Sequence, residues 1–333
     1  MSNYNLIGYS PLMLDVCAEC KLKFQDYISL LSDYNLQIGG RLEVKTTSDF
    51  NNWIKLFTGE SLDLLLKTKG YFLGGGILAS FAAFSTDYQF EASLTIFDSY
   101  NCSLIKDIFY NELYTKFFNW NKLTVFEGCI ICLSLHHADA PERTFIVLKN
   151  IYNTNVFKLS GQLNTLTWIS IFELNDGFFF INLPEISKNK YPFIVSLGDK
   201  DLLNDKIKQL LFSLVESGCL KYLFGNADEF KKMFSKEDYE DSVFFEYMRL
   251  ESASCCTMFL ITNGEKGMVA IYNGSLFYEP ATPNINIVNT NGAGDAAAGG
   301  FISTYLTTND ISKSLSFARE QADRVLSVNS PVL

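Results

Sequence analysis

The second half of the sequence alternates short apolar runs with segments of helical periodicity. Apolar runs at 192–197, 220–224 and 258–262 each have the length of one β-strand. Between the first two, leucine and isoleucine recur at helical spacing over 203–214, and the pattern ends near Gly218. Strands and helices in this order are joined by right-handed crossovers, so the pattern predicts a parallel sheet.

Four other segments carry clear local signals. The run 268–278 predicts a hairpin, because Asn-Gly at 273–274 supplies the positive φ angles of a tight turn between two apolar stretches. Residues 293–305 predict a helix rich in alanine and glycine. The pattern over 52–67 predicts another helix, and 5–8 predicts an opening strand.

The chain of 333 residues is long enough for a large domain with a smaller one attached. We expect an α/β fold with a three-layer α/β/α core, in which helices cover both faces of a mainly parallel sheet. Aromatic and β-branched residues are frequent from 116 to 150, which indicates extra strands. The predicted core comprises 1–15, 50–115 and 151–333, and the predicted β-rich lid comprises 16–49 and 116–150.

The charge balance limits the classes of partner. The sequence has 27 Lys and Arg against 37 Asp and Glu, a net charge of −10, so we expect no nucleic-acid partner. The longest uncharged stretch, 70–86, contains Gly74, Gly75 and Gly76 and is shorter than the roughly 20 apolar residues of a membrane span, so we expect no membrane insertion. The first residues lack the basic and apolar regions of a secretory signal, and we expect a cytoplasmic protein.

Cysteine spacing raises the question of a zinc site. Cys17 and Cys20, and also Cys129 and Cys132, have the CxxC spacing of zinc ligands. The second pair lies in an apolar run typical of a strand, where residues three apart point to opposite faces. Reduced, mostly buried thiols are therefore the expectation.

Histidine-based catalysis has little support. The sequence has two histidines, His136 and His137, which are adjacent, and we expect both to be exposed polar residues. The sequence contains neither a Gly-x-Ser-x-Gly elbow nor a Gly-x-x-x-x-Gly-Lys-Ser/Thr loop. The sequence therefore argues against a hydrolase triad and excludes a P-loop enzyme.

The segment 289–301 is the most informative about chemistry, and it reads Asn-Thr-Asn-Gly-Ala-Gly-Asp-Ala-Ala-Ala-Gly-Gly-Phe. Gly292 and Gly294 let backbone N–H groups converge, and the start of the following helix adds unpaired donors and partial positive charge. Such a helix start binds anions such as phosphate. Asp295, in the first turn, is placed to accept a hydroxyl proton during phosphoryl transfer. A glycine turn followed by a tightly packed helix is the simpler alternative.

This segment resembles the signature of the PfkB (ribokinase-like) carbohydrate and nucleoside kinases, and its wording is most similar to adenosine kinases. Asn226-Ala-Asp-Glu229 is similar to the family's Asn-x-x-Glu, which implies that Asn226 serves the bound nucleotide and that Glu229 holds Mg²⁺ through water. On spacing alone, a helix cap is the simpler explanation of Asn226. A Thr-x-Gly-x-x-Gly turn follows at 262–267, so the resemblance implies further cofactor-binding residues at Thr262, Gly264, Gly267 and, within the signature, Asn291.

Weaker similarities lie in the first half of the chain. The run that ends at Asp15 resembles the family's opening strand, whose Asp binds acceptor hydroxyls. Gly74 and Gly75 resemble the diglycine that closes over the substrate, and Arg143 falls where the family carries an Arg on a lid strand. The resemblance therefore implies that all four residues bind the acceptor.

The resemblance implies a ribokinase-like fold and an ATP- and Mg²⁺-dependent kinase. The enzyme would transfer the γ-phosphate to a hydroxyl of a nucleoside or sugar, most similarly to adenosine kinase. Asp295 would be the base, and the N–H groups of Gly292, Ala293 and Gly294 would form the anion hole. The resemblance also implies a monomer or a homodimer paired through the lids.

Two departures from the family pattern keep other functions open. Ala79 stands where the family carries Asn after the diglycine, and Asn289 replaces the Asp that opens the signature. One alternative is therefore a sugar kinase similar to ribokinase or fructokinase. The other is a non-catalytic relative that binds ligand only.

Overall fold

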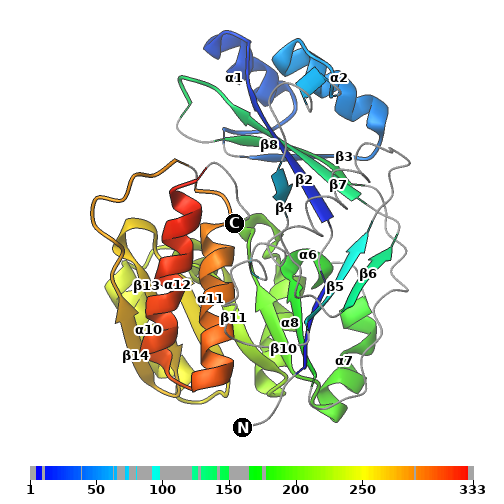
Figure 1. Ribbon diagram of the computed structural model, residues 1–333. Coiled ribbons are helices and arrows are strands. Elements are labelled where there is room, and N and C mark those ends of the chain that lie inside the picture. The colour runs from blue at the N-terminus through cyan, green and yellow to red at the C-terminus, as the bar shows by residue number, and fades with distance from the viewer. Residues whose placement is uncertain are drawn as a thin grey trace.

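The computed structural model describes most of the chain in two sheets with their helices (Figure 1). The described residues are 5–9, 12–38, 40–62, 64–65, 72–74, 80, 92–97, 122–126, 129–140, 143–149, 165–174, 178–288 and 290–328. Every helix in these ranges falls short of the length and apolar character that a bilayer crossing requires.

The large sheet has nine strands and is mostly parallel. Its strands, in spatial order, are β14 (Ser275–Glu279), β13 (Met268–Tyr272), β12 (Met258–Thr262), β11 (Leu220–Asn226), β10 (Phe193–Ser196), β9 (Thr165–Ser170), β1 (Asn5–Tyr9), β5 (Ala92–Phe97) and β6 (Lys122–Phe126). All neighbouring pairs from β12 to β6 are parallel, whereas β12, β13 and β14 pair in antiparallel fashion. The parallel sheet predicted from the alternating pattern is confirmed.

Helices cover both faces of this sheet. They are α6 (Ile171–Leu174), α7 (Phe178–Asn189), α8 (Asp205–Glu216), α9 (Ala227–Phe234), α10 (Asp241–Ser252), α11 (Ala293–Thr308) and α12 (Ile311–Leu326). Side chains alternate between the two faces of a strand, and β12 shows the result. Met258 and Leu260 belong to the core beneath α11 and α12, whereas Phe259 and Ile261 belong to the core beneath α7 to α10. The predicted three-layer arrangement is confirmed.

The small sheet has five strands and lies above the large sheet in Figure 1, with two helices beside it. Its strands, in spatial order, are β3 (Arg41–Val44), β8 (Thr144–Lys149), β7 (Cys129–His136), β2 (Leu12–Glu19) and β4 (Phe72–Gly74). The helices are α1 (Phe24–Asp33) and α2 (Thr47–Thr58). A smaller sheet beside the core agrees with the predicted lid.

The small sheet and the predicted lid boundaries differ at three strands. β2 begins at Leu12 and β4 lies at 72–74, both within segments assigned to the core, and β6 lies in the large sheet although its segment was assigned to the lid. A local sequence pattern can predict that a segment forms a β-strand. It cannot predict which strand pairs with it, because the partner comes from elsewhere in the chain.

Local turn chemistry explains where other elements end. The predicted hairpin is confirmed, and Asn273 and Gly274 have φ angles of 51° and 74°. The helix predicted at 52–67 begins earlier, because the Thr46 hydroxyl caps it by accepting the Asp49 N–H at 3.1 Å. It ends at Gly59, whose φ of 71° terminates the helix in the left-handed region.

One expectation about the histidines is wrong. His136 is exposed as predicted, but His137 is buried and stacks on Tyr27, with ring centroids 5.2 Å apart. Its Nε2 lies 3.0 Å from the Leu22 carbonyl oxygen, and its Nδ1 accepts the Asp139 N–H at 3.1 Å. Partners for both ring nitrogens remove most of the cost of burial, so His137 is a structural residue.

Two glycines of α11, Gly299 and Gly300, allow close approach to neighbouring segments. A Cβ on Gly299 would collide with the carbonyl oxygen of Ser80. A Cβ on Gly300 would lie 2.8 Å from Gln321 Cγ and 3.2 Å from Ala318 Cα, both in α12. Gly299 and Gly300 therefore bring α11 against Ser80 and α12.

Gly300→Ala should destabilise the protein by about 1–3 kcal/mol, because the added methyl group forces α11 and α12 apart. Gly294→Ala on the same helix is the control, since its Cβ would meet only Thr262 Oγ1 at 3.9 Å. Urea unfolding of both variants measures the difference. Equal stability of the two variants would contradict this packing.

Candidate active site

The carboxyl ends of three parallel strands border one cavity of about 380 Å³. Ser196, Asn226 and Thr262 end β10, β11 and β12 on this side, and the start of α11 completes the wall. The lining residues are Ser196, Gly198, Phe224, Gly225, Asn226, Glu229, Leu260, Thr262, Thr290, Asn291, Gly292, Gly294, Asp295 and Ala298. Ligands of open parallel α/β sheets bind at this edge, which makes the cavity the candidate active site.

The start of α11 presents unpaired backbone donors to the cavity. Gly292 is the N-cap, with φ of 80°, and no side chain caps the helix. The first hydrogen bond of the helix runs from the Ala296 N–H to the Gly292 carbonyl at 2.8 Å, so the N–H groups of Ala293, Gly294 and Asp295 precede it. With the helix dipole, these donors form a site suited to an anion.

The carboxyl group of Asp295 lies next to these donors. Asp295 is the third residue of α11, lines the cavity and keeps part of its surface accessible. Burial of the carboxyl group raises its pKa from an ordinary value near 3.8 to about 6. A carboxylate with this pKa can accept a proton near neutral pH.

A second carboxyl group, that of Glu229, lies deeper in the same cavity and is 6% exposed. Its Oε2 accepts the Asn226 N–H at 2.8 Å, and the Asn226 Oδ1 accepts the Glu229 N–H at 2.9 Å, which together form a capping box at the start of α9. Burial, together with the negative charges of Asp295 and Asp199, raises the pKa of Glu229 from 4.5 to about 7, against the hydrogen bonds from the N–H groups of Asn226 and Gly198, which lower it.

The simpler explanation of Asn226 is therefore correct as far as it goes: Asn226 caps a helix. It also lines the cavity, so the two interpretations are compatible. Gly225 explains how Glu229 reaches this position. A Cβ at Gly225 would lie 2.7 Å from Glu229 Oε2 and 3.0 Å from Leu197 Cδ1, so only glycine leaves the space.

The turn after β12 brings one of its three predicted residues to the cavity. Thr262 lines it, and its hydroxyl lies 3.5 Å from the Gly225 carbonyl oxygen. Gly264 begins a 3₁₀ turn (η3, Gly264–Lys266), and neither Gly264 nor Gly267 lines the cavity. The backbone explains why residue 267 is glycine: its φ is 90°, and a Cβ there would collide with the Glu279 carbonyl oxygen.

Two of the predicted acceptor residues, Asp15 and Gly74, lie on strands of the small sheet. Asp15 lies in β2 opposite Phe72 of β4, and Gly74 pairs with Met13. Arg143 precedes β8 and is partly buried. Gly75, like Ala79 and Asn289, lies outside the described residues. The structure therefore brings Asp15 and Gly74 near each other in one sheet.

Seven lining residues escape the sequence reasoning: Ser196, Gly198, Phe224, Gly225, Leu260, Thr290 and Ala298. Ser196 ends a correctly predicted strand and Gly198 follows it, so the rule that binding sites form at the carboxyl ends of parallel strands could have found both. Gly225 has no signal of its own, because its importance depends on the position of the Glu229 side chain.

The residues present fit Mg²⁺. Mg²⁺ is usually held by one or two carboxylates with several waters, and two carboxyl groups whose charges repel share this cavity. Among the described residues, no group of three or more His, Cys, Asp or Glu could enclose a metal ion. A water-mediated ion at Glu229 is the arrangement that this donor set allows.

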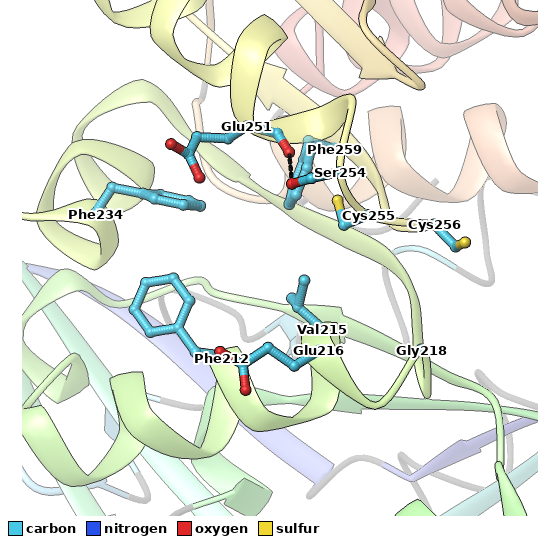
Figure 2. Close-up of a pocket in the computed structure, with 10 residues that line it drawn as sticks. All are labelled: Phe212, Val215, Glu216, Gly218, Phe234, Glu251, Ser254, Cys255, Cys256 and Phe259. Carbon is cyan, nitrogen blue, oxygen red and sulfur yellow. Dashed lines mark hydrogen bonds between the residues drawn. The ribbon is translucent and has the colours of Figure 1, made fainter.

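Figure 2 shows a second cavity, of about 300 Å³, between the carboxyl ends of α8 and α10. Phe212 and Val215 line one side, and Phe234, Phe259 and Cys255 lie opposite them. Because Cys255 precedes β12 and Thr262 ends it, this cavity lies near the amino end of β12, away from the candidate active site at its carboxyl end. None of the predicted site residues between 226 and 295 lines it.

Comparison with known proteins agrees with this geometry. Residues 189–331 match the family described as pfkB family carbohydrate kinase, and every element that borders the candidate active site lies within this range. The resemblance predicted from the sequence is confirmed. No curated protein sequence matches the chain.

Solved structures show the same fold over nearly the whole chain. Adenosine kinase from Sinorhizobium meliloti has a TM-score of 0.73 at 15% identity, covering 99% of this chain and 96% of its own. A probable sugar kinase from Rhizobium etli has 0.74 at 15%, covering 99% and 95%. Adenosine kinase from Schistosoma mansoni, in complex with 2-fluoroadenosine, has 0.72 at 16%, covering 100% and 98%. At 15–16% identity, these likenesses show that the chain shares its fold with these kinases.

Glu229→Gln should change how stability depends on pH. Because the folded-state pKa of Glu229 is raised from 4.5 to about 7, the folded protein loses stability as the pH rises through this window. Gln cannot ionise and keeps an oxygen for the Asn226 N–H, so the variant should be more stable above pH 7 by about 1–3 kcal/mol. Urea unfolding at pH 5 and pH 8 measures this, with Glu265→Gln, an exposed residue, as the control. Parallel pH profiles of Glu229→Gln and the parent protein would refute the raised pKa.

Gly267→Ala should destabilise the protein by more than about 2 kcal/mol, because the new Cβ would collide with the 279–281 backbone. Gly264→Ala is the matched control in the same turn, since its φ is also positive, at 53°, but its Cβ would meet nothing within 4 Å. It should cost about 1 kcal/mol. Thermal unfolding distinguishes them, and equal losses would show that Gly267 is not needed for its space.

Proposed function

We propose that this protein is an ATP-dependent kinase that transfers the γ-phosphate to a hydroxyl of a nucleoside in the manner of adenosine kinase, which converts adenosine to AMP. The single observation that carries the proposal is that unpaired N–H groups at the start of α11 and the Asp295 carboxyl group face one cavity. The adenosine kinases among the similar structures, one of them in complex with 2-fluoroadenosine, support a nucleoside as acceptor.

Each part of the cavity has a role in this proposal. The N–H groups of Gly292, Ala293 and Gly294 stabilise the charge that develops on the transferred phosphoryl group. Asp295 accepts the proton of the attacking hydroxyl, which its raised pKa permits near neutral pH. Asn226 and Glu229 hold Mg²⁺ through water, and this ion, when bound, would neutralise phosphate charge.

The remaining predicted residues orient the two substrates. Thr262 and Asn291 line the cavity on the nucleotide side, and Gly264 and Gly267 shape the adjoining turn. Asp15, Gly74, Gly75 and Arg143 would bind the acceptor from the small sheet, which would close over it and exclude water. Cytoplasmic location and a monomer or lid-paired homodimer stay predictions from the sequence.

A sugar kinase is the second candidate, favoured by the similarity to the probable sugar kinase from Rhizobium etli. Incubation with ATP, Mg²⁺ and separate acceptors (adenosine, other nucleosides, ribose and fructose), followed by mass spectrometry of the products, distinguishes the two. Phosphorylated adenosine would support the proposal, and a phosphorylated sugar alone would support the second candidate. Nucleotide binding without any product would favour a non-catalytic relative, for which Ala79 and Asn289 argue.

Asp295→Asn should lower turnover by about 10²–10⁴-fold, because the amide cannot accept the hydroxyl proton. ATP affinity should change little, since the anion hole consists of backbone groups. Turnover measurements and calorimetric titration with ATP check both statements. Asp228→Asn, an exposed change in the first turn of α9, is the control. Near-normal turnover of Asp295→Asn would rule out its role as base.

A further inference from the structure

Arg41 connects the small sheet to the large one. It is the first residue of β3, at the edge of the small sheet, yet its guanidinium group contacts residues of the large domain. Its Nη1 lies 3.4 Å from Asp199 Oδ2, and its Cζ lies 4.8 Å from the centroid of the Phe172 ring. One side chain therefore makes both an ion pair and a cation–π contact across the two sheets.

These two partners lie at the edge of the large sheet that carries the candidate active site. Phe172 is in α6, directly after β9, and Asp199 follows β10 by three residues. Ser196 ends β10, Gly198 lies between Ser196 and Asp199, and both line the cavity. Arg41 thus attaches the small sheet at a point adjacent to the cavity wall.

The contact is partly shielded from water. The side chains of Arg41 and Asp199 are 18% and 19% exposed, so their attraction is screened less than that of a surface pair. Nη2 of Arg41 also lies 2.8 Å from Glu43 Oε1, an ion pair without hydrogen-bond alignment. Nε and Nη2 are buried without a hydrogen-bond partner among the described residues. The positive charge of Arg41 is therefore stabilised by the carboxylates of Asp199 and Glu43 and by the Phe172 ring.

We propose that Arg41 is a clasp that holds the small sheet closed beside the cavity and so acts as a positioning residue for phosphoryl transfer. This rests on the proposed kinase function. Without the clasp, the small sheet would open more often and water would reach the γ-phosphate. Water would then replace the acceptor hydroxyl, its oxygen would bond to phosphorus as the bond to ADP breaks, and the products would be ADP and inorganic phosphate.

The variants separate charge from size. Arg41→Gln removes the cation and keeps most of the side-chain length, and Asp199→Asn removes the anion while retaining an oxygen for the Asp201 N–H, which Oδ1 now accepts at 2.9 Å. Arg249→Gln is the matched control, because Arg249 pairs with Glu246 within α10. Arg41 and Asp199 both keep some exposure, so we expect all of these variants to fold.

Hydrogen–deuterium exchange of the ligand-free protein tests the clasp independently of activity. Peptides that cover 40–46 and 197–204 should exchange about five- to tenfold faster in Arg41→Gln than in the parent, and the double variant Arg41→Gln/Asp199→Asn should exchange no faster than the stronger single variant. Unchanged exchange in Arg41→Gln, or additive effects in the double variant, would overturn the proposal.

Kinetics then test the positioning role. The ratio of phosphate release to acceptor phosphorylation should rise about five- to tenfold in Arg41→Gln, with a higher KM for the acceptor, and Arg249→Gln should match the parent. Faster hydrogen–deuterium exchange with an unchanged ratio of phosphate release to acceptor phosphorylation would overturn the positioning role. It would still support the contact of Arg41 that holds the small sheet closed. If the parent phosphorylates no acceptor, the kinase function fails, and exchange still decides whether the clasp exists.

Discussion

The arrangement of the candidate active site depends on one feature, the uncapped start of α11. In α2, α8, α9 and α12 a side chain accepts a hydrogen bond from a first-turn N–H group, but Gly292 begins α11 and no side chain caps it. The donors therefore stay available to an anion at the carboxyl edge of a parallel sheet. The close approach of Gly299 to Ser80 and of Gly300 to α12 fixes the helix in place, so the donors are preorganised.

The second constraint is the presence of two carboxyl groups in this small space. Glu229 and Asp295 raise the free energy of the ligand-free protein when both are ionised, and their raised pKa values express that cost. Gly225 is what permits it, because any larger residue would displace Glu229. Unfavourable electrostatics kept in place by packing are typical of functional sites, since a bound cation or a transferred proton relieves them.

The sequence was sufficient to predict those parts of the structure that depend on interactions between neighbouring residues. The alternation of strands and helices, the Asn273-Gly274 turn and the glycine-rich start of α11 could all be read from neighbouring residues. It was insufficient where the partner is distant. No local pattern shows that β4 pairs in the small sheet, or that His137 finds partners for both nitrogens and is buried. For the same reason, Gly225 and Arg41 could be recognised only once the strands had brought Glu229 and Asp199 beside them.

The central claim is that the start of α11 binds the terminal phosphate of ATP. A crystal structure of the protein with Mg²⁺ and a non-hydrolysable ATP analogue tests it most directly. The account predicts γ-phosphate oxygens within about 2.7–3.2 Å of the backbone nitrogens of residues 292–294, with the Asp295 carboxylate facing the side from which a hydroxyl would attack. An analogue whose phosphates lie elsewhere, with these N–H groups turned away from them, would contradict it.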